Sequence, residues 1–71
     1  MLVPETKTKI RTRIKMIQID KNWSIEDMCA ITGDKPGTML NKLRGAQPFN
    51  LDDVINFVEA SGVSYDYICG R

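Results

Sequence analysis

The side chains best suited to chemistry gather in the segment 35–44. Lysine, arginine, asparagine and threonine recur there, and together they supply ammonium, guanidinium, amide and hydroxyl groups. Such groups bind anions and exchange hydrogen bonds without making or breaking covalent bonds. The segment is therefore a candidate recognition surface, and its polar members are Lys35, Thr38, Asn41, Lys42 and Arg44.

The remaining polar residues give little to an enzyme or a metal site. Acidic pairs at 26–27 and 52–53 fall in the first turns of expected helices, where carboxylates stabilise the positive end of the helix dipole. The chain has two cysteines and no histidine, so zinc lacks a ligand set. Cys29 and Cys69 are expected to be reduced and packed as small apolar residues. We predict no enzymatic activity, no metal and no cofactor.

The segment 24–45 predicts two short helices joined by a tight turn. Ser24 can cap the first helix, and Asp27 stands three residues later as a short capping-box partner. Gly33 follows and can adopt the left-handed conformation that such a turn needs. Helix, turn and helix are thus expected in that order.

The second of these helices is weakly specified. Pro36 suits the first helical position because its missing amide proton would be unpaired there. Lys35 would then be the cap, and lysine is a poor one. Gly37 in the first turn costs about 1 kcal/mol of helix propensity relative to alanine.

The whole chain reads as one small all-α domain. Seventy-one residues with clear helical periods are enough for one compact core. Residues 1–5 are expected to form a flexible N-terminal arm, and residues 6–71 the domain. Its predicted helices span residues 6–20, 24–32, 36–44, 51–61 and 64–69.

Apolar residues and a glycine recur at a distinctive spacing across the two central helices, at Met28, Gly33, Met39 and Leu43. The pattern is continued by Lys42, Arg44, Gly45, Pro48 and Phe49. This pattern, from about Ile10 to Ile68, resembles the Cro/C1-type helix-turn-helix proteins of bacteria and their phages. The resemblance implies a five-helix, lambda-repressor-like DNA-binding domain and a dimer on a palindromic operator.

The resemblance also implies which residues meet DNA. The early base-reading positions fall on Lys35, Pro36 and Gly37, and a later one on Asn41, so two of them have no polar side chain. Thr38 is expected on the same surface. Lys42 and Arg44 are expected to hold the phosphate backbone, or else to be cations at an exposed helix end. The cations of the basic first helix form either a solvated face or a surface that contacts phosphate or an acidic partner. They are Lys7, Lys9, Arg11, Arg13 and Lys15, of which Arg13 and Lys15 are the expected DNA contacts.

Departures from the family pattern support a second hypothesis. Ile25 replaces a polar phosphate-binding residue, and Asp34 stands where an apolar residue normally faces the core. In this alternative the fold is kept but binds a protein, such as the DNA-binding domain of a co-encoded repressor, and acts as an antirepressor or modulator of repression. The partner-binding residues would be Ile25, Pro36, Gly37 and Leu40.

Charge and hydropathy bear on location and partners. Net charge is +1, yet residues 1–23 sum to +4 and the remainder to −3, which suggests a face for an anionic partner. No apolar run is long enough to span a membrane and no signal peptide is visible, so a cytoplasmic protein is expected. Tyr65 and Tyr67 in the last helix either support a homodimer or close the core.

Overall fold

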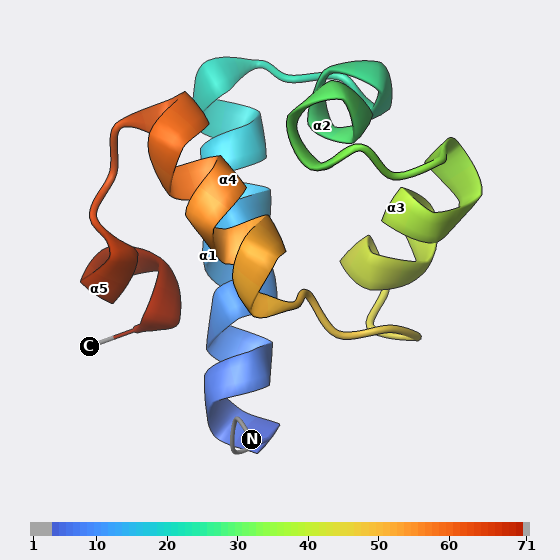
Figure 1. Cartoon of the computed structure of the whole chain (residues 1–71). Helices are drawn as coiled ribbons and strands as arrows, with labels where there is room; N and C mark the ends of the chain where they lie inside the picture. Colours follow the sequence, from blue (N-terminus) through green and yellow to red (C-terminus); the bar gives the residue numbers. More distant parts are fainter. Residues whose placement is uncertain (1–3, 71) are drawn as a thin grey trace.

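Proline, capping side chains and glycine set the ends of the helices. This computed structural model describes the backbone of residues 4–70 and the side chains of residues 7–70. Within this range the secondary structure is entirely helical, so the prediction of a compact all-α fold is confirmed. The helices are α1 (Pro4–Lys21), α2 (Ile25–Thr32), α3 (Pro36–Leu43), α4 (Leu51–Ser61) and α5 (Tyr65–Cys69) (Figure 1).

The first helix begins earlier than predicted. Pro4 and Glu5, which we assigned to an N-terminal arm, are the first residues of α1. Proline fits this place because the first amides of a helix have no intrahelical acceptor, so nothing is lost with its missing N–H. Residues 1–3, the rest of that predicted arm, lie outside the described residues.

Helices α2 and α4 begin with the same reciprocal cap. The Ser24 hydroxyl accepts from the Asp27 amide at 3.1 Å, and the Ser24 amide donates to the Asp27 carboxylate at 2.9 Å. Asn50 and Asp53 repeat this arrangement at α4. Lys35, the cap of α3, makes no such side-chain hydrogen bond. The expectation that Lys35 is a poor cap for α3 is therefore confirmed.

The core lies where α1 meets the other helices. Ile10, Ile14 and Ile17 turn one stripe of α1 inward, and α1 contacts α3, α4 and α5 (Figure 1). Met28 and Phe57 are fully buried beside that stripe. Burying each such side chain contributes about 1.5–3 kcal/mol, so this packing holds the short helices in place.

Candidate nucleic-acid interface

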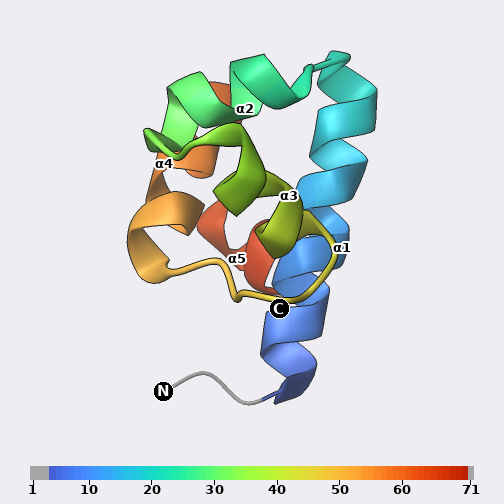
Figure 2. The same ribbon diagram turned by 90° about the vertical axis from the view of Figure 1, so that its right-hand side faces the viewer.

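Helices α2 and α3 form a bent pair joined by a short turn. Gly33 adopts the left-handed conformation with φ of 80°, and its amide donates to the Cys29 carbonyl at 2.7 Å. Turning the molecule brings α3 to the front, with the loop 44–50 and the N-terminal half of α1 on the same side (Figure 2). Residues far apart in sequence therefore share this side of the molecule.

The outward surface of α3 is poor in polar atoms. Pro36 and Gly37 are exposed, and Leu40 is 42% exposed. Among the expected base readers, Lys35 is exposed, while Thr38 and Asn41 are half-buried. A helix presented this way has few groups in its first turn that could read a base edge.

Asn41 also shapes the loop that follows α3. Its backbone carbonyl accepts from the amides of Ala46, at 2.9 Å, and Gln47, at 3.3 Å. The loop thus folds back against the last turn of α3, and Arg44 caps the helix with an exposed side chain.

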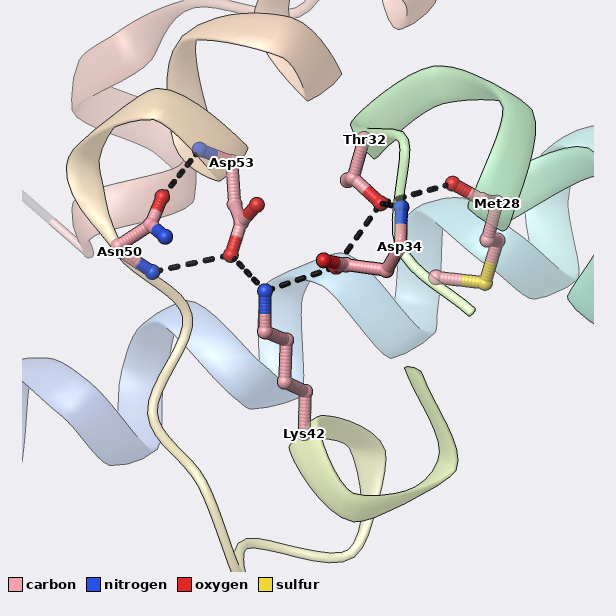
Figure 3. Close-up of polar contacts among 6 residues, drawn as sticks. All are labelled: Met28, Thr32, Asp34, Lys42, Asn50 and Asp53. Atoms are coloured by element: carbon pink, nitrogen blue, oxygen red, sulfur yellow. Dashed lines mark hydrogen bonds and ion pairs between the residues drawn. The ribbon is translucent and has the colours of Figure 1, made fainter. Parts of the chain in front are cut away.

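Lys42 does not lie at an exposed helix end, and this expectation was wrong. The residue is 5% exposed, and its Nζ lies 2.7 Å from Asp34 Oδ2 and 2.6 Å from Asp53 Oδ2 (Figure 3). We call these three residues the ion triad. Contact between Lys42 and a DNA phosphate would require breaking both ion pairs, so its assignment as a phosphate contact is withdrawn.

The ion triad also explains why a carboxylate stands in the turn at Asp34. That carboxylate accepts from the Thr32 hydroxyl at 3.0 Å as well as from Lys42 (Figure 3). Burial alone would lower the pKa of Lys42, but the hydrogen bonds and charges of Asp34 and Asp53 outweigh it, so the pKa is raised above its ordinary value. Lys42 therefore stays charged and joins the turn, α3 and α4.

Three cations of α1 lie along one stripe. Lys7, Arg11 and Lys15 are spaced four residues apart, which places them above one another on one side of a helix. Arg11 lies against the loop after α3, because a Cβ added at Gly45 would collide with its guanidinium. Lys7 and Arg11 belong to the basic helix surface considered from sequence, but Arg13 and Lys15 were singled out there, although the four-residue spacing of Lys7, Arg11 and Lys15 was a visible signal.

Arg13 lies on the other side of α1, which contradicts its assignment to the DNA surface. Its Cζ is 4.9 Å from the centroid of the Tyr67 ring in α5, a cation–π distance. Lys15, two residues further on, is exposed and belongs to the stripe with Arg11. Of the two DNA contacts predicted on α1, Lys15 alone lies on the stripe with Arg11.

The apolar residues named for a protein partner do not form one exposed patch. Ile25 is half-buried and packs against the core. Pro36, Gly37 and Leu40 are exposed along α3. Of the four residues named for a partner, the exposed ones therefore all belong to α3.

Several observations bear on other kinds of site. Cys29 is half-buried, Cys69 is buried, and both are free thiols. Between residues 7 and 70, no group of His, Cys, Asp or Glu side chains could hold a metal ion. Across the described part of the chain, no helix has the length and apolar character needed to cross a membrane.

The cations that remain accessible define what we call the basic face. Lys42 offsets one of the two negative charges of Asp34 and Asp53, so the ion triad as a whole keeps one negative charge. The basic face consists of Lys7, Arg11 and Lys15 from α1, with Lys35 and Arg44 at the two ends of α3.

Comparisons of the chain with models of protein families, with curated proteins and with solved structures found no match.

Proposed function

We propose that the protein is a DNA-binding transcriptional regulator of the Cro/C1 helix-turn-helix type, acting in the genetic switch of a phage or mobile element. The observation that carries the proposal is the position of Arg11. It brings the basic stripe of α1 against the loop that follows α3. Cations from both parts of the chain can then meet one phosphate backbone while α3 enters a groove.

The size of α3 suits this mode of docking. Eight residues make a helix about 12 Å long, and the major groove of B-DNA is wide enough to admit a helix. Lys35 at its start can donate to guanine, and Asn41 can pair with adenine if its half-buried amide turns outward. Thr38 offers one further hydroxyl.

Phosphate contacts outweigh base reading in this arrangement. Five cations make up the basic face, whereas the first turn of α3 adds no polar side chain after Lys35 until Thr38. Binding should therefore weaken steeply with salt, with a slope of log K against log salt of about −4.5 if all five contact phosphate. Sequence selectivity should be modest.

Fluorescence anisotropy of labelled duplexes, tiled across the region around the protein's own gene, tests the proposal. We expect binding at low salt, a preferred duplex that persists near physiological salt, and loss of that preference in Asn41→Ala. Arg44→Ala should weaken binding to all duplexes alike, and Arg13→Ala serves as the matched arginine control. Absence of duplex binding at low salt would refute the proposal.

A homodimer on a palindromic site belongs to the same proposal. Tyr65 and Tyr67 are 38% and 36% exposed, so both keep surface that a second copy of the chain could cover. Sedimentation equilibrium, with and without a duplex carrying two half-sites, measures the stoichiometry. One copy per duplex would remove this part of the proposal.

A second function is favoured by the exposed Leu40. Together with Pro36 and Gly37 it gives α3 an apolar outer surface where a DNA reader would carry polar groups. In this alternative, α3 binds the DNA-binding domain of a neighbouring repressor and removes it from its operator. Leu40→Lys separates the two functions, because it should abolish repressor binding yet preserve or strengthen DNA binding.

A further inference from the structure

A pocket opens between the N-terminal half of α1 and the loop after α3. Its volume is about 310 Å³, at the lower end of the range for small-molecule sites. Both α1 cations that face the loop contribute to its walls. Its lining includes Lys7, Arg11, Gly45 and Gln47, and Pro48 and Phe49 add apolar surface.

The charge of this pocket is not compensated within the described side chains. Between residues 7 and 70 the ion pairs are those of the ion triad, and neither Lys7 nor Arg11 takes part in them. Lys42 also borders the pocket, but its ammonium is committed to Asp34 and Asp53. An anion entering the pocket therefore meets two cations that no carboxylate among side chains 7–70 pairs with.

Gly45 leaves room for the Arg11 guanidinium against the loop after α3. Its φ is 88°, in the left-handed region, and a Cβ there would overlap guanidinium atom Nη1. The absence of a side chain lets the planar guanidinium lie directly on the loop. Arginine held in this way presents a fork of donors that matches two oxygens of a phosphate.

We propose that this pocket is a binding site for a single phosphate group. Arg11 makes the bidentate contact, the ammonium of Lys7 supplies a second charge, and the exposed amide of Gln47 donates a further hydrogen bond. The phosphate can come from a DNA backbone, in which case the inference rests on the proposed function. The phosphate can equally come from a small phosphate ester, in which case the inference does not depend on the proposed function.

Titration of the ¹⁵N-labelled protein with inorganic phosphate, at constant ionic strength maintained with NaCl, tests the site. We expect saturable NMR shifts of the Arg11 Nε–H, the Gly45 amide and the Gln47 side-chain amide. Arg11→Ala should weaken binding about tenfold or more, as expected for loss of a charge-assisted hydrogen bond. Gly45→Ala should weaken it several-fold by displacing the guanidinium.

Controls separate loss of the site from loss of the fold. Arg13→Ala removes an arginine from the opposite side of the same helix and should leave the phosphate titration unchanged. If Arg11→Ala does not fold, Lys7→Ala and Gln47→Ala change exposed residues of the same pocket and should still weaken binding. Phosphate-induced shifts as large in Arg11→Ala, Lys7→Ala and Gln47→Ala as in the wild type would overturn the proposal.

A second titration with a short duplex distinguishes the two phosphate sources. If duplex and inorganic phosphate shift the same pocket signals and compete, the site holds a DNA phosphate. If phosphate binds but no duplex does, the site stands for a small phosphate ester and the proposed DNA function fails. If the duplex shifts α3 signals while the pocket responds to neither titrant, the site is refuted and DNA binding stands. If nothing binds, both proposals fail.

Discussion

The ion triad and the pocket between α1 and the loop after α3 are neighbours, because Lys42 belongs to the triad and also borders the pocket, and they use positive charge in opposite ways. The buried ammonium of Lys42 is paired with Asp34 and Asp53, and so it joins α3 to the turn before it and to α4. Arg11 lies on Gly45 with no carboxylate paired to it among residues 7–70. A cation therefore stabilises the fold where its partners are built in, and is free to bind an anion where they are missing.

The largest effect should come from breaking the ion triad. Lys42→Met would leave two carboxylates close together and partly buried, and we expect a loss of about 3 kcal/mol or more in the free energy of unfolding. Urea denaturation followed by circular dichroism measures this loss. Adding Asp34→Asn and Asp53→Asn to Lys42→Met should restore much of it. A single variant as stable as the wild type would show that the triad does not hold the helices together.

Removing charge from the basic face should change binding more than stability. Lys7→Ala combined with Arg44→Ala should weaken duplex binding about tenfold or more and reduce the magnitude of the salt slope by about 2. The free energy of unfolding should change by less than about 0.5 kcal/mol, because both side chains are exposed.

The matched control for this double variant is Lys9→Ala with Arg13→Ala on the α5 side of α1. Lys9 packs against Gly70 and Arg13 lies over Tyr67, so this pair should lower stability slightly and leave the salt slope unchanged. If the salt slope of duplex binding were the same for the two double variants, the two sides of α1 would not differ in DNA binding.

Alkaline pH should weaken the ion triad. Because the pKa of Lys42 is raised in the folded state, its contribution is fully present below the unfolded value of 10.5 and is lost as pH rises through the folded value. The stability difference between wild type and Lys42→Met should be constant from about pH 7 to 9 and shrink above about 10.5. Denaturation of both proteins across this range measures it, and a difference that grew with pH would contradict the assigned charges.

The smallest effect should come from strengthening α3, the helix that links the two regions. Gly37 has no positive φ, and a Cβ added there meets nothing within 4 Å. Gly37→Ala should therefore stabilise the protein by about 0.5–1 kcal/mol. Thermal unfolding measures the gain, and Gly62→Ala is the contrasting control, because its φ of 78° makes the same change unfavourable. A loss in Gly37→Ala would mean that α3 needs the freedom of glycine at this place.

Local signals in the sequence account for most of the fold. Ser24 and Asn50 cap the helices that they precede, and Gly33 and Gly62 end helices in the left-handed conformation. Pro4 was misread because proline both breaks helices and begins them, and its neighbours give no periodic pattern to decide between the two. The helix-turn-helix identity and the DNA partner stay predictions.

The candidate site was harder to predict because it depends on which side each element faces. Burial of Lys42 follows only from the approach of Asp34 and Asp53, which local periodicity cannot show. Arg11 and Arg13 are alike in type, and their roles differ because one faces the loop after α3 and the other faces α5. The four-residue spacing of Lys7, Arg11 and Lys15 could have identified the stripe.

The ion triad also has a consequence for the order of folding. It closes over separations of 8 and 11 residues, whereas Arg13 meets Tyr67 from near the opposite end of the chain. Closing a short loop costs less entropy than closing a long one, so the central segment can condense first and the terminal helices dock on it later. We expect the transition state for folding to be structured around Lys42, with Tyr67 joining only on the native side of the barrier.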